Sequence, residues 1–335
     1  MKSRNFILIA AIVGAALFFV ARFGALSYGE YVFFAGYTVL QYVVLATAWN
    51  MLGGYTGYVN FGSAAFFAVG AYTSVFFHKL YPLPIPVLVV AAAVVAGLCG
   101  LGMGYLTLRL RGAFFSIATL ALAVVLQTLV VNWDFVGGAR GAYVIRPANV
   151  DMNWLGETVS GFIAHNLISN YLQYLFLIML ILAIGAIATA RAIERSMLGF
   201  GFAAIRDDEL AAEASGVPTL KLKLIATALS GAFMGMAGAP FPYYISFLQP
   251  SSAFGLEYAV NSIAMPIIGG TATWVGPLVG AILLGTLQQV ATVTISSAVN
   301  VLLVGLLLVF FVIVAPNGLV GVMQKLFRGK PGAQT

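Results

Sequence analysis

Charged side chains are scarce in this sequence: Asp, Glu, Lys and Arg together make up 8% of its 335 residues, whereas 61% are hydrophobic. A soluble domain carries about 25% charged residues and about 45–50% apolar ones. The mean hydropathy of +1.01 over the whole length is too high for a protein whose surface faces water. This shortage of charge excludes a soluble enzyme, a disordered protein and a repeat solenoid.

Cysteine and reactive clusters are also nearly missing. Cys99 is the single cysteine, so an intrachain disulfide is excluded. The apolar segments lack a grouping of His, Asp, Glu and Cys that could run catalysis, so we expect no metal, no cofactor and no enzymatic activity. Lys and Arg outnumber Asp and Glu by sixteen to ten. In a membrane chain this excess reports topology first, and we expect no nucleic-acid partner.

Ten apolar segments approach or exceed the roughly 17–25 residues that a helix needs to cross about 30 Å of hydrocarbon. They are 6–21, 31–52, 61–77, 85–108, 113–131, 167–190, 224–247, 258–275, 278–296 and 298–315. Within lipid every backbone N–H and C=O must be paired inside the protein, which a helix achieves. The sequence therefore predicts an all-α bundle of about ten transmembrane helices. Segment 258–275 is the weakest, because Pro266 and a glycine pair interrupt it.

The positive charges predict the orientation of these helices. With the N-terminus in the cytoplasm, Arg22, Lys79, Arg140 and Arg146 fall outside and the other twelve Lys and Arg residues fall inside. This split follows the positive-inside rule. An even number of spans then places the C-terminus in the cytoplasm as well. Segment 6–21 lacks a convincing cleavage site, so we expect it to be retained as a helix rather than removed as a signal peptide.

Residues 1–335 are expected to form a single transmembrane domain, because no hydrophilic stretch is long enough for a separate soluble one. Three segments stand out between and after the spans: an outside loop 132–166, a charge-dense inside loop 191–223 and a basic inside tail 316–335. Glycine pairs at 53–54 and 269–270 sit in similar contexts, but one short match is too little to predict a duplicated fold.

The inside loop specifies a short helix. Asp207 or Asp208 can cap its N-terminus, because a carboxylate there accepts hydrogen bonds from unpaired backbone N–H groups. Gly216 can adopt the left-handed conformation that ends a helix, and Pro218 prevents continuation. A helix of about two turns is marginal in water, so it must dock on something. A linker helix that packs against its own bundle is an equally good interpretation of these residues.

Seven short segments, spread over nearly the whole chain, share a resemblance to one protein family. They are 50–57, 62–72, 108–112, 137–138, 195–199, 204–217 and 316–319. As a set they resemble the Liv-type branched-chain amino-acid permease subunits of ABC importers. The general signature of ABC importer permeases is Glu-Ala-Ala, three residues and Gly. Here Leu210-Ala211-Ala212 and Gly216 align with it, and the glutamate falls one place early, at Glu209.

This resemblance implies that the short helix is a coupling helix, which sits in a groove of a cytoplasmic ATPase subunit. Small residues would allow the close contact, while acidic residues and an arginine hold the helix. The residues expected at this coupling site are Arg206, Asp207, Asp208, Glu209, Leu210, Ala211, Ala212, Glu213 and Gly216. The resemblance also implies a second permease subunit, two ATPase subunits, a periplasmic binding protein and a place in the bacterial inner membrane.

The sequence limits the source of energy. A phosphate-binding loop of the form Gly-x-x-x-x-Gly-Lys-Ser/Thr does not occur in it, so a partner must bind ATP if ATP drives transport. Ionisable side chains that relay protons or sodium within spans are nearly missing too, which disfavours an ion-coupled symporter. A passive channel for a small neutral solute stays open as an alternative.

Polar uncharged side chains near or within the spans are candidates for a translocation pathway. They are Asn50, Thr56, Asn60, Ser63 and Asn261. The first four surround a glycine-rich break after segment 31–52, and such irregular backbone is tolerated at membrane depth only when it is buried or lines a cavity. Alternatively, these groups simply bind a neighbouring helix. We expect transport of branched-chain or other apolar amino acids, with urea, short amides or aromatic acids as alternatives.

Overall fold

The computed structural model describes residues 3–81, 83–107, 110, 112–145, 170–294 and 318–327, with isolated positions between 302 and 313. Its longer helices are α1 (Ser3–Tyr28), α2 (Tyr31–Thr56), α3 (Ser63–Leu80), α4 (Ile85–Thr107), α5 (Ala113–Val131), α7 (Tyr171–Glu194), α10 (Thr219–Gly238), α13 (Leu256–Gly269) and α14 (Val275–Thr294). The shorter ones are η1 (Asp134–Val136), η2 (Gly138–Arg140), α8 (Met197–Asp207), α9 (Glu209–Ala214), α11 (Phe241–Ile245), α12 (Pro250–Ala253) and α16 (Gly318–Phe327). Strands β1 (Ala142–Tyr143) and β2 (Phe247–Leu248) pair antiparallel.

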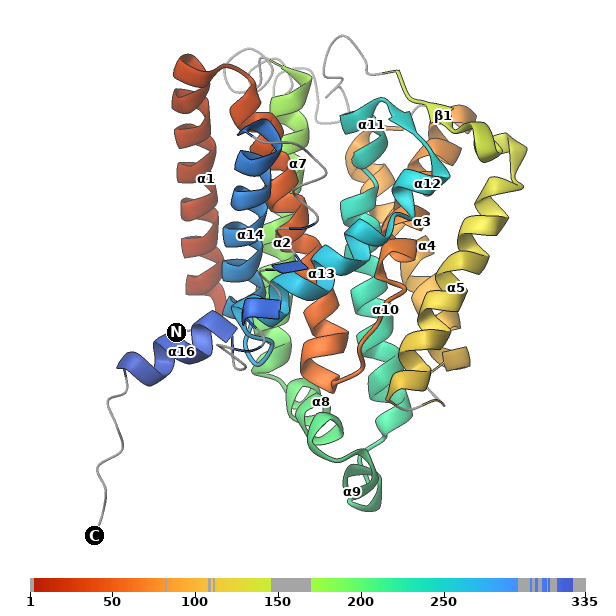
Figure 1. The fold of residues 1–335 in the computed structure, drawn as a ribbon, viewed down its shortest axis with the longest axis vertical. Coiled ribbons are helices and arrows are strands. Elements are labelled where there is room, and N and C mark those ends of the chain that lie inside the picture. Colours follow the sequence, from red (N-terminus) through yellow and green to blue (C-terminus); the bar gives the residue numbers. More distant parts are fainter. Residues whose placement is uncertain are drawn as a thin grey trace.

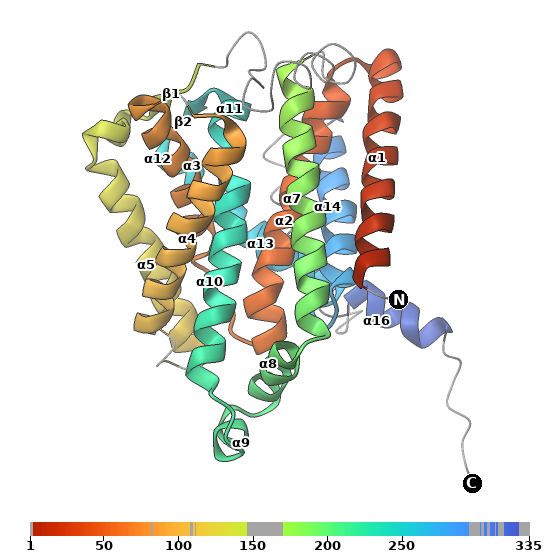
Figure 2. The ribbon, with the colours of Figure 1, turned by 180° about the vertical axis from the view of Figure 1, so that it is seen from behind.

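The long helices form two groups with α13 between them (Figure 1). One group contains α1, α2, α7 and α14, and the other contains α3, α4, α5 and α10. Helix α13 packs against α2 and α14 on one side and against α3 on the other. Helices α8 and α9 project from one end of the bundle, which is called the α9 end below. The small sheet, α11 and α12 lie at the opposite end (Figure 2).

Six of the described helices are long and apolar enough to cross a bilayer. They are Tyr31–Thr56, Ile85–Thr107, Ala113–Val131, Tyr171–Glu194, Thr219–Ile245 and Val275–Thr292. Large apolar side chains on them, such as Val90, Ile117 and Leu129, are exposed as expected of a surface that faces lipid. The chain is therefore an all-α, polytopic membrane protein. Predicted segment 298–315 lies largely outside the described residues, so the number ten stays a prediction.

Segment 258–275, predicted as one span, is instead divided between two helices and a turn. Helix α13 has 14 residues, which is about 21 Å and short of the about 30 Å hydrocarbon core. The helix ends at Gly269, and the following Gly270 has a φ of +115°, which other residues rarely adopt. The following helix approaches so closely that a Cβ on Gly269 would lie 1.8 Å from the carbonyl oxygen of Gly276. The glycines thus allow a tight α13–α14 hairpin in place of a continuous span.

The most extensive helix contact joins α10 to α4, and α3 packs on the same helix. Small residues make this possible. A Cβ on Gly70 of α3 would lie 2.1 Å from the carbonyl oxygen of Gly235 of α10, so only glycine permits this approach of the two backbones. Close packing through small residues is typical of helices within membranes.

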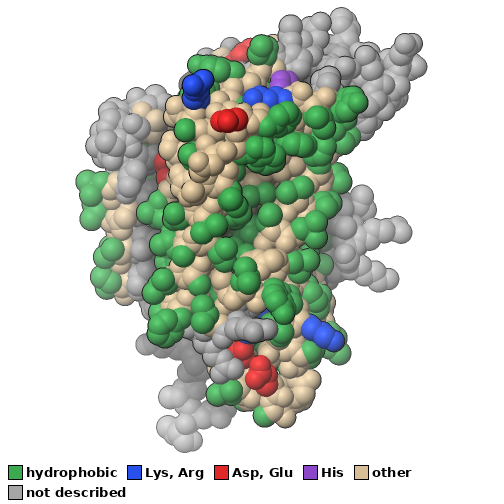
Figure 3. Space-filling view, turned by 90° about the vertical axis from the view of Figure 1, so that its right-hand side faces the viewer, with side chains coloured by type: hydrophobic (Ala, Val, Ile, Leu, Met, Phe, Trp, Pro, Cys, Tyr) green, Lys and Arg blue, Asp and Glu red, His purple; other side chains and the backbone are tan. Residues whose placement is uncertain are grey.

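Charged side chains gather at the two ends of the bundle (Figure 3). The α9 end carries the charged residues of α8 and α9, and the opposite end carries Asp134 of η1 and Arg140 of η2. The surface between them is mainly apolar. This distribution suits a protein whose middle faces hydrocarbon, where an ionised side chain is unfavourable.

Candidate functional sites

The N-terminus of α9 is capped by a side chain, as the sequence predicts. The Oδ1 atom of Asp208 accepts hydrogen bonds from the backbone N–H groups of Leu210 (2.9 Å) and Ala211 (3.1 Å). Asp207 is the last residue of α8, so it does not cap α9. The side chain of Asp208 therefore caps the N-terminus of α9.

The C-terminus of α9 is closed by a Schellman motif. Gly216 has a φ of +84°, in the left-handed region. Its backbone N–H donates to the carbonyl of Glu213, and the N–H of Val217 donates to the carbonyl of Ala212, both at 3.0 Å. The predicted short helix is thus present: it has six residues, or about 1.7 turns, and both of its ends are capped.

One face of α9 is open to its surroundings. Leu210 is 62% exposed, and Ala211 and Ala214 are exposed beside it. Ala212 differs from the prediction, because it is only 5% exposed and is buried by this chain itself. The exposed apolar surface of α9 therefore includes Leu210, Ala211 and Ala214, whereas the side chain of Ala212 packs against the rest of the chain.

The other charged residues predicted at this site lie around α9. Arg206 and Asp207 form an exposed pair with 3.7 Å between Nε and Oδ1, an arrangement that adds little stability in water. Glu213 accepts a hydrogen bond at 2.6 Å from the hydroxyl of Thr219, the first residue of α10. Arg206 also lies against Gly57, where α2 ends.

A buried cluster joins α9 to the bundle, and it is called the α9 anchor here: Tyr58, Glu209 and Lys223. The Nζ atom of Lys223 donates to Oε1 of Glu209 at 2.7 Å and to the Tyr58 hydroxyl at 3.2 Å. The Tyr58 hydroxyl donates to Oε2 of Glu209. The sequence identified Glu209 but missed Tyr58 and Lys223, because no local pattern pairs residues 151 positions apart.

The five predicted pathway residues are all buried, at 1–2% exposure. Asn50, Thr56 and Asn60 lie at the end of α2 and in the break that follows it, residues 57–62. Hydrogen bonds fold this break back on α2, since the Trp49 indole N–H donates to the Asn60 carbonyl at 2.9 Å. The Thr56 hydroxyl donates to a carbonyl of its own helix. These bonds account for part of the polarity without a pathway.

Ser63 and Asn261 belong to a second cluster, called the polar seam here: Tyr42, Ser63, Asn261, Ser262 and Gln288. The Gln288 amide donates to Oδ1 of Asn261 at 2.9 Å, and the Asn261 amide donates to the Tyr42 hydroxyl at 3.4 Å. The hydroxyls of Ser63 and Ser262 are 2.9 Å apart. The seam therefore links α2, α3, α13 and α14 through neutral groups.

Several buried polar atoms near these clusters have no partner among the described residues. They include both amide atoms of Asn50, Nδ2 of Asn60 and Oε1 of Gln288. Buried polar groups in proteins are usually paired, because burial without a partner is unfavourable. Free hydrogen-bonding capacity is therefore present at the break and in the seam.

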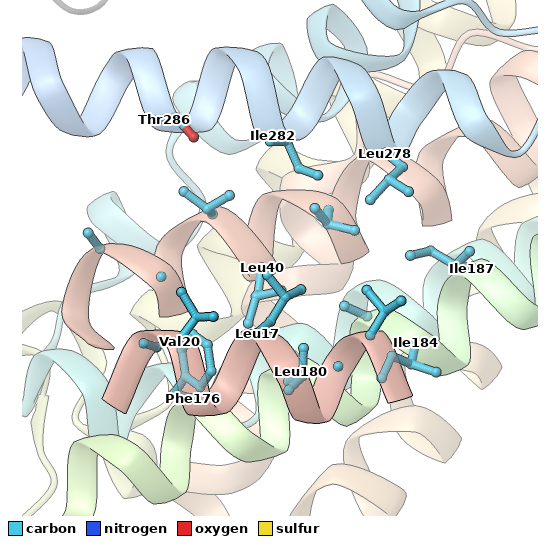
Figure 4. A pocket seen from close by; sticks show the side chains of 18 of the residues that line it. Leu17, Val20, Leu40, Phe176, Leu180, Ile184, Ile187, Leu278, Ile282 and Thr286 are labelled. Atoms are coloured by element: carbon cyan, nitrogen blue, oxygen red, sulfur yellow. The ribbon is translucent and has the colours of Figure 1, made fainter. Parts of the chain in front are cut away.

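A cavity of about 960 Å³ lies between α1, α2, α7 and α14 (Figure 4). Its walls are almost wholly apolar, with side chains such as Leu40, Phe176 and Ile282 pointing into it and Thr286 among the few polar ones. None of the five predicted pathway residues lines it. The cavity therefore suits an apolar group, not a zwitterion.

Among the described residues, no group of three or more His, Cys, Asp or Glu could hold a metal ion.

Helices of membrane-spanning length with neutral polar clusters between them define a polytopic membrane protein, and a comparison with known families identifies it as a transport component. The chain belongs to the family of branched-chain amino acid transport system permease components, which it matches over residues 31–312. This range includes α9, the α9 anchor and the polar seam.

Individual relatives agree with this assignment. The chain is 26% identical to the high-affinity branched-chain amino acid transport system permease protein LivM of Salmonella typhimurium. The match extends over 303 residues, which are 87% of this chain and 70% of that protein. LivM of Escherichia coli is 27% identical over 302 residues, with the same coverage. A probable branched-chain amino acid transport permease protein, LivH of Methanocaldococcus jannaschii, is 25% identical over 287 residues, which are 81% of this chain and 85% of that one.

Proposed function

We propose that the chain is the permease subunit of an ABC importer that moves branched-chain amino acids across the bacterial inner membrane. Membership of the permease family and the names of the similar proteins support this function. The sequence has no phosphate-binding loop of its own, which is consistent with ATP hydrolysis on a separate subunit. A second permease subunit, two ATPase subunits and a periplasmic binding protein complete the proposed assembly.

The observation that carries the coupling role is the geometry of α9. A six-residue helix is unstable alone, yet here both of its ends are capped and Glu209 fixes it to the bundle. The exposed face formed by Leu210, Ala211 and Ala214 is small and apolar, so it can enter a groove of an ATPase subunit. We assign α9 as the helix through which the ATPase acts on this chain.

The proposed topology places the α9 end in the cytoplasm, with ten helices and both termini on that side. The loop 191–223 is then the cytoplasmic coupling loop, 132–166 the periplasmic loop and 316–335 the cytoplasmic tail. The gathering of charge at the two ends of the bundle supports two aqueous faces. The count along the sequence favours this orientation, because it assigns twelve of the sixteen Lys and Arg residues to the side of the loop 191–223.

The proposed pathway follows the break 57–62 and the polar seam. Asn50, Asn60 and Gln288 keep unpaired hydrogen-bonding atoms there among the described residues. Amides and hydroxyls can guide the ammonium and carboxylate groups of an amino acid without fixed charges, while the apolar helices accept its side chain. The role of Asn50, Thr56, Asn60, Ser63 and Asn261 in transport is part of this proposal.

The test compares two arginine substitutions in the complete importer, reconstituted in proteoliposomes. Ala211→Arg places a long charged side chain on the exposed face of α9, and Ala113→Arg makes the same change at an exposed position where α5 begins. We expect Ala211→Arg to lose co-purification of the ATPase and ATP-dependent leucine uptake, whereas Ala113→Arg keeps both. ATPase binding and leucine uptake that persist in Ala211→Arg would contradict the proposed function.

A further inference from the structure

The α9 anchor joins three elements that are distant in sequence. Tyr58 lies in the break between α2 and α3, Glu209 is the first residue of α9, and Lys223 lies in the first turns of α10. Both carboxylate oxygens of Glu209 are occupied, one by the Lys223 ammonium group and one by the Tyr58 hydroxyl. The ammonium group also lies 4.8 Å from the centre of the Tyr58 ring. Each member therefore contacts the other two.

Burial restricts the movement of the side chains in the α9 anchor. The side chains of Lys223 and Glu209 are 4% and 13% exposed, and Tyr58 is 8% exposed. An exposed ion pair is weakened by water and salt, but a buried pair with additional hydrogen bonds is short and strong. Phe115 of α5 packs edge-on against the Tyr58 ring and limits its movement further. A displacement of Glu209 must therefore move Tyr58 or break this cluster.

The break that contains Tyr58 is in turn tied to the membrane helices. The Ser116 hydroxyl of α5 donates to the Val59 carbonyl at 2.8 Å, and the Phe61 N–H donates to the Thr119 hydroxyl at 3.2 Å. The break ends at Ser63, which begins α3 and belongs to the polar seam. Contacts thus run without interruption from α9 to the seam.

We propose that Tyr58 and Lys223 are positioning residues that hold α9 to the α2–α3 break, so that movement of α9 shifts the break and α3. This inference rests on the proposed coupling role of α9. It adds a specific connection: the ATPase acts on the transport pathway through the Tyr58 hydroxyl and the Glu209–Lys223 pair. Coupling is a free energy shared by two sites, so the test measures how ATP hydrolysis and transport are linked.

The test uses the complete importer with its binding protein in proteoliposomes, and it measures leucine transported per ATP hydrolysed together with ATPase co-purification. Tyr58→Phe removes the hydroxyl and keeps the ring. We expect the transport ratio to fall about tenfold, the order expected for loss of a hydrogen bond to a charged group, with co-purification unchanged. Tyr55→Phe is the matched control, because the buried Tyr55 hydroxyl bonds to the Ala190 carbonyl of α7 and not to α9.

Lys223 supplies a second pair of variants. Lys223→Met is expected to lower the same ratio, and Lys223→Arg is expected to retain it because the charge and its donors remain. If Lys223→Met fails to assemble, Tyr58→Phe still decides the matter. If the ratio of leucine transported to ATP hydrolysed is unchanged in Tyr58→Phe, the inference is overturned. This includes the case in which uptake and ATP hydrolysis fall in equal proportion.

The two proposals fail in different ways. If Ala211→Arg leaves the ATPase bound and active in transport, then α9 is not the coupling helix and the proposed function fails. If Ala211→Arg releases the ATPase while Tyr58→Phe keeps the ratio, then α9 couples by another route and only this inference fails.

Discussion

The α9 anchor and the polar seam are both buried and hydrogen-bonded, yet one is charged and the other is neutral. Lys223 and Glu209 approach to 2.7 Å in the anchor, and Gln288 and Asn261 approach to 2.9 Å in the seam. The anchor lies at the α9 end of the bundle, where other charged residues gather. The seam lies between helices of the apolar middle.

The difference follows from the surroundings of each cluster. Moving an ion from water into a medium of low polarity is very unfavourable, and a partner charge compensates only in part. A charged pair is therefore tolerable at the end of the bundle, where water and polar backbone are near. Within the hydrocarbon region, neutral amides and hydroxyls can still form bonds between helices without that penalty. The predictions below test this contrast.

The largest effect is expected when the anchor is left with one charge. Glu209→Leu removes the carboxylate from the buried Lys223 ammonium group, and we expect a loss of about 3–5 kcal/mol in stability. The double variant Glu209→Leu with Lys223→Met removes both charges and should lose less than Glu209→Leu alone. Thermal unfolding of the purified importer in detergent measures both. A double variant less stable than the single one would contradict the assignment of a buried ion pair.

A charge placed in the polar seam should also lower the stability of the folded protein. Asn261→Asp introduces a carboxylate among apolar helices, and we expect a loss of about 2.5–3.5 kcal/mol near neutral pH. Burial raises the pKa of such a carboxyl, so the loss should shrink as the pH falls and the group becomes protonated. The measurement is the unfolding temperature of the importer between pH 5 and 8, roughly the range that Asp titration reaches when buried. A loss that does not depend on pH would mean that the seam is hydrated.

Removing polarity from the seam should have a smaller effect. Asn261→Leu deprives Gln288 and Tyr42 of their partner, and we expect a loss of about 1–3 kcal/mol because those groups stay buried. Adding Gln288→Leu removes one of the stranded groups. The double variant should therefore lose less than the sum of the two single variants, as measured by a double-mutant cycle in thermal unfolding. Strict additivity would show that the two amides do not interact.

Local features of the sequence were enough to predict part of this picture. Hydrophobic length predicted a polytopic helical membrane protein, and Asp207 or Asp208 with Gly216 and Pro218 predicted a short helix with defined ends. Both signals are local, because capping and periodicity depend on residues a few positions apart. The glycine pair at 269–270 already cast doubt on segment 258–275, and the structure divides that segment at Gly270.

Contacts between distant residues could not be predicted in the same way. Tyr58 and Lys223 meet Glu209 only because the α2–α3 break and the start of α10 lie together at the α9 end. The burial of Ala212 likewise depends on how α9 rests on the bundle. Gly54 likewise lies close to the residue that follows the second glycine pair, since a Cβ on Gly54 would lie 2.9 Å from the Thr271 carbonyl oxygen. Only the packed structure reveals these neighbours.

The smallest effect on stability is expected for the Ser63–Ser262 pair of the polar seam. Ser63→Ala removes a hydrogen bond to Ser262 across the α3–α13 contact, and a bond between membrane helices contributes about 0.6 kcal/mol on average. Ser74 on the same helix provides a matched control, because its buried hydroxyl has no partner among the described residues.

Ser74→Ala should leave stability unchanged or raise it, since it removes a buried polar group that gains nothing from the fold. The two alanine variants and the double variant Ser63→Ala with Ser262→Ala are compared by thermal unfolding of the importer. An equal loss for Ser63→Ala and Ser74→Ala would indicate that both hydroxyls are hydrated, as in an open pathway. The neutral seam would then differ from the charged anchor in its access to water as well as in its charge.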